Sequence, residues 1–488
     1  MDNGIRRPGN SPAHSSRTLR PRPADRGPLS FGQQRLWFLD RWLSGRPVYN
    51  VPVTLRFTGP LPADAGDRLL AALHAVAAGQ DVLFTVIEEG ADGEPRQRVL
   101  ADRTVPGRRV DLSAGGVGGD RARLRSRAEE LVKAEAVAPF DLAAGPMVRF
   151  LLLRLADGEL WLHLTFHHIA CDGWSVEVFQ RQLLAAWERE GTAEGPRGSG
   201  APRVQFADYA LWQREAVAGP RAGAALAAWE KALDGAPEVL DLGTGKPRPA
   251  ELTHRGRTAS FPLTGVPLEA LETFAARQNA TLYMVLLASF QTLVARHAGR
   301  EDIVLGSPVA GRGLPQLNEL VGFFADSLVI RTDLSDDPSF RSLVGRSRAG
   351  VLDALGRSRV PFDVAVQRLR PERSLSHTPV VQVVFALHEE EPEVSLPGGV
   401  EVRRTMVPTD TAKFDLTWSV YRGAGGLRLE VEYATDLFDA ADVATLVGHW
   451  RTLLDHAVRE PDLPVSRLEL MPAGERERVA SWSGGGRT

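Results

Sequence analysis

The stretch that most constrains the fold is a pair of apolar runs, MVRFLLLRL and ELWLHLTFHHI, separated only by Ala-Asp-Gly. Two such runs around a short turn predict a β-hairpin, with Asp157 and Gly158 in the turn. Beyond the second run, apolar residues recur at helical spacing from Val176 to Trp187, and Ser175 is the expected N-cap. The sequence therefore predicts two antiparallel strands that lead, through the segment HHIACDGWS, directly into a helix.

Helical and strand patterns alternate on both sides of a Gly- and Pro-rich break, GTAEGPRGSGAPR. Before the break, DRARLRSRAEELVKAEAVA has a helical period that ends at Pro139. After it, helical patterns such as LYMVLLASFQTLVARHAG alternate with strand patterns such as DIVLGSPVAG, SLVIRTDL and LRLEVEYAT. This mixture predicts an α/β fold of two lobes, over residues 29–190 and 204–470, joined by a linker at 191–203.

The two ends of the chain differ in composition from the rest. Residues 1–28 hold six arginines against two aspartates, with many prolines and few apolar residues, which predicts a disordered basic segment. Residues 471–488 end on glycines, as the start of a linker to a further domain would.

Composition narrows the class of protein. A net charge of -3 and a hydrophobic content of 43% indicate no bulk attraction to nucleic acid or to membranes. No apolar run reaches the ~18 residues of a membrane span, and no secretory signal pattern opens the chain, so a cytoplasmic location is expected. The single cysteine, Cys171, excludes a disulfide framework and multi-cysteine metal sites.

The adjacent histidines at the end of the second run fall on opposite faces of a strand. His163, Thr165 and His167 share one face, whereas His168 lies on the other, more apolar face. A metal site is not predicted, because adjacent histidines on a strand diverge and no third ligand lies at suitable spacing. No G-x-S-x-G elbow is present for a Ser–His–Asp hydrolase. Taken alone, these residues favour a structural role for the pair over a catalytic one.

A set of motifs in a fixed order resembles the condensation domains of nonribosomal peptide synthetases. HHIACDGWS is similar to their His-His-x-x-x-Asp-Gly signature, and LSFGQQRLWFL is similar to their opening motif. FADYALWQ, LVGFFADSLVIR and VPFDVAVQRL follow in the family's order, and MPAGERERVASW resembles the linker into an adenylation domain. The resemblance runs from about Leu29 to Trp482.

The resemblance implies a fold like that of chloramphenicol acetyltransferase, with two lobes in a V shape and a substrate tunnel between them. An upstream carrier protein would present an acyl or peptidyl thioester, and a downstream carrier an aminoacyl thioester. Attack of the amine on the thioester would form the peptide bond. Both substrates would ride on phosphopantetheine arms of the carriers, so the domain itself would bind no cofactor and no metal.

The resemblance also implies roles within the signature. His168 would face the tunnel and contact the attacking amine, and His167 would face away and hold the backbone. Asp172 would be an anchor, paired with Arg35 or Arg331, and Gly173 would supply a backbone N–H or clearance. Further candidates for the tunnel wall are Trp174, Asp326 and Ser327.

Departures from the family pattern keep further functions open. The second family motif is reduced to GQDVLFT, Asp326 replaces the usual Asn, and RSRVPFD replaces the common His-Gln-Asp version. These changes fit either tolerated variation or a specialised domain that also modifies its substrate, for instance by dehydrating a seryl residue. An epimerisation domain and a recruitment platform without catalysis also stay open, and the opening motif and intact signature favour condensation over both.

The ends of the chain give expectations about partners. No carrier motif precedes the basic segment that follows Met1, so a donor carrier is expected to dock in trans. Adenylation and carrier domains are expected to be fused beyond Thr488.

Overall fold

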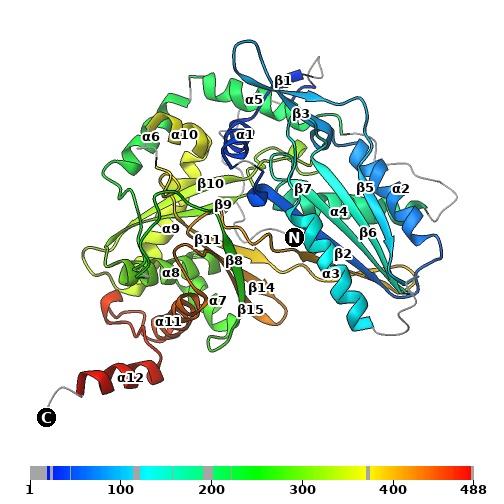
Figure 1. The fold of residues 1–488 in the computed structure, drawn as a ribbon. Coiled ribbons are helices and arrows are strands. Elements are labelled where there is room, and N and C mark those ends of the chain that lie inside the picture. Colours follow the sequence, from blue (N-terminus) through cyan, green and yellow to red (C-terminus); the bar gives the residue numbers. More distant parts are fainter. Residues whose placement is uncertain are drawn as a thin grey trace.

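The computed structural model describes residues 19–21, 26–43, 45–113, 121–156, 158–190, 202–220, 222–243, 245–369 and 374–484. They form two α/β lobes, each built on a mixed six-stranded sheet (Figure 1). The predicted α/β class with two lobes is confirmed. The predicted linker lies outside the described residues from 191 to 201.

The first lobe is built around the predicted hairpin. Its sheet has the order β12-β13-β2-β7-β6-β5, with β2 (Asn50–Thr58), β5 (Gly107–Asp111), β6 (Val148–Ala156), β7 (Glu159–His167), β12 (Val394–Leu396) and β13 (Val400–Met406). β6 and β7 pair antiparallel, and Gly158 takes a φ of 76°, which glycine adopts without a steric penalty. Asp157 lies outside the described residues. All of β7 is buried because helices cover both faces of the sheet.

Those helices pack on opposite faces of the first sheet. α2 (Ala65–Ala78) and α4 (Gly173–Glu190) contact each other and share the larger core with Leu162 and Leu164. α3 (Arg121–Val137), the predicted helix before Pro139, packs on the other face against Leu151 and Trp161.

The segment 1–28 was predicted to be disordered, but residues 19–21 and 26–28 of it are among the described residues. β1 (Arg26–Pro28) pairs with β4 (Pro95–Val99), which in turn pairs with β3 (Thr85–Glu89). Leu19 is buried, and its N–H donates to the side chain of Gln316. These residues are ordered because the folded chain supplies partners for their backbone.

The second lobe has a sheet of order β10-β9-β11-β14-β15-β8. Its strands are β8 (Gly256–Leu263), β9 (Asp302–Val309), β10 (Asp326–Asp333), β11 (Val383–Glu389), β14 (Leu416–Gly423) and β15 (Gly426–Ala434). The helices α7 (Leu268–Arg277), α8 (Leu282–Ala298), α9 (Phe340–Arg357) and α11 (Ala440–Arg459) pack on it. α8 is the central helix, since every residue from Tyr283 to Val294 is buried.

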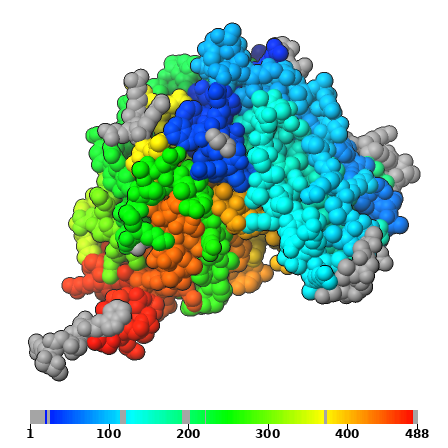
Figure 2. Space-filling view, viewed as in Figure 1, coloured from blue at the N-terminus to red at the C-terminus, as the bar shows by residue number. Residues whose placement is uncertain are grey.

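The chain crosses between the lobes, so the predicted division at 191–203 is wrong as a spatial boundary. β12 and β13 come from the second half of the sequence but extend the first sheet, where β13 pairs with β2 (Figure 1). Phe206, Phe323 and Phe324 also belong to the first core. Figure 2 shows the two lobes meeting across the middle of the molecule and separated by an open notch at one edge.

The remaining elements are five helices and four short 3-10 turns of the described residues, of which α12 lies beside the second lobe (Figure 1). They are α1 (Phe31–Leu43), α5 (Phe206–Ala218), α6 (Ala222–Leu233), α10 (Phe362–Leu369) and α12 (Ala473–Gly484), with short 3-10 turns η1 (Pro47–Tyr49), η2 (Asp81–Phe84), η4 (Pro315–Leu317) and η5 (Val465–Arg467). α12 occupies most of the predicted linker at 471–488, and Glu475 accepts a hydrogen bond from His449 at 2.9 Å. None of the helices within the described residues combines the length and apolar character needed to cross a membrane.

Candidate functional site at the junction of the lobes

His167 is the last residue of β7 and is fixed by its neighbours. Its Nδ1 accepts a hydrogen bond from the Ile169 N–H at 3.1 Å, and its Nε2 lies 3.6 Å from Oδ1 of Asp40. The ring is buried, and burial lowers its pKa. His167 therefore carries its proton on Nε2 and holds the backbone where the strand ends.

His168 follows the strand and is partly exposed. Its backbone N–H donates to the Tyr49 carbonyl at 2.7 Å, and its Nδ1 lies 2.7 Å from the Cys171 carbonyl. Because a carbonyl only accepts, Nδ1 carries the proton and Nε2 presents a lone pair. Burial, and secondly the positive charge of Lys413, hold the pKa of His168 well below its usual value. The ring is therefore neutral at about pH 7.

Asp172 connects the signature segment to the segment that precedes β10. Its Oδ2 accepts the N–H groups of Phe324 and Ala325 at 2.9 and 3.0 Å. Its Oδ1 accepts the Ser175 N–H at 2.8 Å, so Asp172, and not the predicted Ser175, caps α4.

The cation beside Asp172 is Arg312, and both predicted partners are wrong. Nη2 of Arg312 lies 3.5 Å from Oδ1 of Asp172, and both side chains are only 3% exposed. Arg35 pairs instead with Asp363, with Nε 2.8 Å from Oδ1. Arg331, on β10, pairs with Asp302.

Arg312 was missed because a Gly-Arg-Gly turn does not by itself show which distant residue its arginine will contact. It follows β9 in the sequence AGRGLP, and it donates to Ser175 Oγ at 2.8 Å and to the Leu320 carbonyl at 2.9 Å. Gly311 has a φ of 63°, and a Cβ there would collide with the Phe324 carbonyl oxygen. An arginine between two glycines at the end of a buried strand is the signal that could have identified it.

A cavity of about 1090 Å³ lies next to this network. Its volume is slightly above the ~300–1,000 Å³ range of small-molecule sites. Gly173 and Trp174 line it at the start of α4, and Asp326 lines it at the start of β10. Ser327 is not among the residues that line this cavity, and its place in a tunnel wall stays a prediction. A Cβ on Gly173 would meet no protein atom within 4 Å, so the glycine leaves room on the cavity side.

Phe323 connects His168 to the cavity. It lines the cavity, and its ring centroid lies 4.8 Å from that of His168 in an edge-to-face arrangement. His168 is not itself among the lining residues, and its ring contacts the lining residue Phe323; that His168 faces a substrate tunnel stays a prediction. A Cβ on Gly32 would lie only 2.8 Å from the Phe323 ring. The close contact between α1 and this ring therefore requires glycine at position 32.

The carboxyl of Asp326 is held in an unusual environment at the start of β10. Its Oδ1 accepts the N–H groups of Ser327 and Phe362 at 2.8 and 3.1 Å. Burial, and secondly the charge of Asp363, raise the pKa of Asp326 to about 7, although Arg35 acts in the opposite direction.

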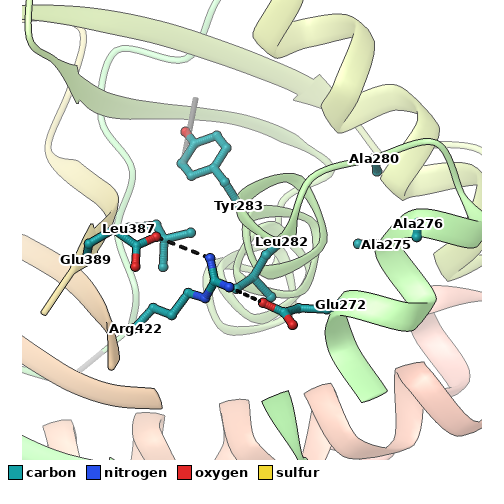
Figure 3. Close-up of a pocket in the computed structure, with 9 residues that line it drawn as sticks. All are labelled: Glu272, Ala275, Ala276, Ala280, Leu282, Tyr283, Leu387, Glu389 and Arg422. Carbon is teal, nitrogen blue, oxygen red and sulfur yellow. Dashed lines mark hydrogen bonds and ion pairs between the residues drawn. The ribbon is translucent and has the colours of Figure 1, made fainter. Parts of the chain in front are cut away.

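A smaller pocket of about 220 Å³ adjoins the cavity in the second lobe and shares Tyr283, Leu387 and Glu389 with it. Figure 3 shows Arg422 between two carboxylates there, at 3.4 Å from Glu389 and 2.7 Å from Glu272. The described residues contain no group of three or more His, Cys, Asp or Glu placed to hold a metal.

Comparison with known proteins identifies related sequences and structures. The family model described as "Condensation domain" matches residues 24–479. One of the linear gramicidin synthase proteins of Brevibacillus parabrevis is 37% identical over 467 residues, which are 95% of this chain and 6% of that protein. Phosphinothricin tripeptide synthetase PhsC of Streptomyces viridochromogenes is 38% identical over 462 residues, 93% of this chain and 41% of that protein. The chain thus spans less than half the length of either relative.

The fold is also similar to a solved domain. The crystal structure of the X-domain from teicoplanin biosynthesis superposes with a TM-score of 0.80 at 28% identity, covering 93% of this chain and 100% of that one. The similarity therefore includes both lobes and the junction between them.

Proposed function

The chain belongs to the condensation-domain family of nonribosomal peptide synthetases, and on that premise we propose that it forms an amide bond between two carrier-bound thioesters. The donor is an acyl or peptidyl thioester, and the acceptor is an aminoacyl thioester. The observation that carries the proposal is the neutral imidazole of His168, whose unprotonated Nε2 can accept a hydrogen bond. The ring lies close to a cavity large enough for the tethered substrates.

In the proposed step, the acceptor amine attacks the thioester carbonyl carbon, the C–N bond forms and the C–S bond breaks. The amine loses one proton, and the departing sulfur leaves as a thiolate that takes up a proton. His168 Nε2 accepts a hydrogen bond from the amine and orients it. Because the pKa of His168 is depressed, whereas a free α-amine titrates at about 7.7–8, the imidazole is a weak base. Orientation of two tethered reactants supplies more of the rate than proton removal.

The start of α4 supports the same step. Gly173 and Trp174 are in the first turn, where backbone N–H groups have no acceptor within the helix. Both residues line the cavity, so in the proposed step their N–H groups and the positive end of the helix dipole stabilise the oxyanion of a tetrahedral intermediate. Asp172 acts through position, since it holds the start of α4 against Phe324 and Ala325.

The partners in this proposal are two carrier proteins with phosphopantetheine arms, together with an adenylation domain that loads the acceptor. The arms belong to the carriers, and the reacting groups are attached to them as thioesters. This chain contributes the imidazole of His168 and the backbone donors at the start of α4.

The test is transfer between two carriers supplied as separate polypeptides, each loaded with a defined acyl or aminoacyl group. Mass spectrometry of the acceptor carrier should show the summed mass of the two groups. A further loss of one water would replace plain condensation with the modifying function. An acceptor that stays unextended with every donor would contradict amide formation.

A recruitment platform is the second candidate, because the X-domain of teicoplanin biosynthesis, 28% identical, has been solved in a complex with OxyB. A platform requires its docking surface and does not require His168. Partner binding that persists in a chain with no transfer activity would favour it.

A further inference from the structure

Asp326 presents a carboxyl to the cavity that amide formation, as proposed above, does not use. It is the first residue of β10 and lines the cavity. Both of its backbone hydrogen bonds, from Ser327 and Phe362, go to Oδ1. This oxygen is therefore fixed by the main chain, and Oδ2 is the oxygen available to a ligand.

The charged and titratable groups around Asp326 come from three helices. They are Arg35 of α1, Asp363 of α10 and Tyr209 of α5. The Arg35 guanidinium lies 2.8 Å from Asp363 and pairs with that carboxylate. Asp326 is thus left with a second carboxylate nearby and no cation of its own among these three neighbours. Burial of a carboxylate without a cation is unfavourable, which is why its pKa is raised to about 7.

We propose that Asp326 is a specificity-determining residue whose Oδ2 receives an ammonium group of the acceptor, either its α-amine or an amine on its side chain. The proposal rests on the amide-forming function above and names its substrate class. A bound ammonium supplies the cation that the carboxylate lacks and restores its ionised form. A carboxylate on the substrate would instead be repelled, so acidic acceptors are excluded from the same position.

The variant that isolates the charge is Asp326→Asn. Asn keeps the oxygen that accepts from Ser327 and Phe362 and almost the same volume, and it removes only the ionisable oxygen. The matched control is Asp333→Asn at the other end of β10. Asp333 Oδ1 accepts the Ser335 N–H at 2.9 Å on the exposed surface, so that change also removes one carboxylate from the strand but none from the cavity.

Binding is measured by calorimetry with four pantetheine amides, in which a stable amide replaces the thioester: hexanoyl, 2-aminohexanoyl, 6-aminohexanoyl and 2,6-diaminohexanoyl. The set varies the two amines independently at constant chain length. Because hydrogen bonds to charged groups contribute strongly, the recognised amine should improve the Kd of the wild-type protein by about tenfold or more. Asp326→Asn should remove most of that preference, and Asp333→Asn should keep it.

The outcomes separate the two sources of the ammonium. Loss of the preference for the 2-amino ligands identifies the α-amine, and loss for the 6-amino ligands identifies the side chain. If the preference is absent in the wild-type protein, unchanged in Asp326→Asn, or lost equally in Asp333→Asn, the proposal is wrong. This experiment measures binding, so it is independent of the transfer assay. A failure of carrier-to-carrier transfer would contradict the proposed function, whereas the role of Asp326 would still be decided by the binding data.

Discussion

His167 and His168 are adjacent in the chain and carry their protons on opposite ring nitrogens. Nδ1 of His167 accepts from the Ile169 N–H, whereas Nδ1 of His168 donates to the Cys171 carbonyl. The difference arises because the strand ends between them, so each ring meets a different backbone group of the following turn. One histidine thereby stabilises the turn, and the other presents an unprotonated Nε2.

His168→Ala should remove carrier-to-carrier transfer while the fold is retained. Loss of an orienting or basic group costs roughly 10²–10⁴-fold in rate, and His168 follows the end of β7, so its side chain is not part of the strand that the sheet requires. Transfer is followed by mass spectrometry and the fold by circular dichroism and Tm. Full transfer by His168→Ala would contradict the proposed role of His168 in orienting the attacking amine.

Acid should destabilise the protein through His163, which is fully buried between Thr54 and Thr165. Burial, and secondly Arg149, lower its pKa to about 3. The unfolded chain takes up this proton below about pH 6.5, whereas the native chain does not, so the free energy of unfolding falls as pH falls below that value. The loss should reach about 3 kcal/mol at about pH 4.

Urea unfolding of the wild-type protein and of His163→Gln over this pH range checks the assignment. Glutamine retains polar atoms for the two threonines and has no proton to take up in this range. Its stability should depend less steeply on pH than that of the wild-type protein, whatever its absolute stability. Identical slopes would show that His163 does not cause the loss.

Removal of Asp172 should destabilise the junction as well as inactivate it. Asp172→Ala leaves the buried Arg312 without its carboxylate and the N–H groups of Phe324 and Ala325 without their acceptor. Breaking a buried pair in this way costs about 3–5 kcal/mol of unfolding free energy.

The control for Asp172 is Asp302→Ala, which breaks the more exposed pair with Arg331. That change should cost less than about 1 kcal/mol. Comparison of the two by denaturant unfolding isolates the effect of burial. An Asp172→Ala protein as stable as the wild type, but inactive, would indicate a direct chemical role for Asp172.

Local pattern was sufficient for the elements that carry the signature. β6, β7 and α4 were predictable because their periodicity and turn lie within one continuous stretch, and the opposite orientation of two adjacent histidines follows from the geometry of a strand. The family resemblance, rather than the pattern, indicated which of the two is available for chemistry.

The lobe boundary and the partner of Asp172 depend on contacts between distant segments. Val402 of β13 pairs with Phe57 of β2, and nothing near Val402 specifies which sheet it joins. Arg331 was a reasonable candidate from its motif, but its strand directs it to Asp302, while a turn after β9 brings Arg312 to Asp172. Periodicity and charge pattern are local properties, so they do not specify which distant strand or ion-pair partner a residue will contact.

Lys413 should tune the imidazole of His168. Its ammonium lies 5.8 Å from the ring centroid of Tyr49, whose carbonyl accepts the His168 N–H. Its positive charge lowers the pKa of His168, second only to burial. Lys413→Met keeps a chain of similar length without the charge, so the pKa of His168 should rise towards its usual value and remain below it, because burial persists.

The measurement for Lys413 is an NMR titration of the imidazole nitrogens, with Lys133→Met as the control. Lys133 lies on the exposed surface of α3, where it pairs with Asp410. Its replacement should therefore leave the pKa of His168 the same as in the wild-type protein. A raised pKa brings protonation of Nε2 closer to neutral pH, and a protonated ring cannot accept a hydrogen bond from the amine. Transfer by Lys413→Met should therefore decline at a higher pH than transfer by the wild-type protein as the solution is acidified. If the imidazole titrates identically with and without Lys413, burial alone keeps His168 neutral.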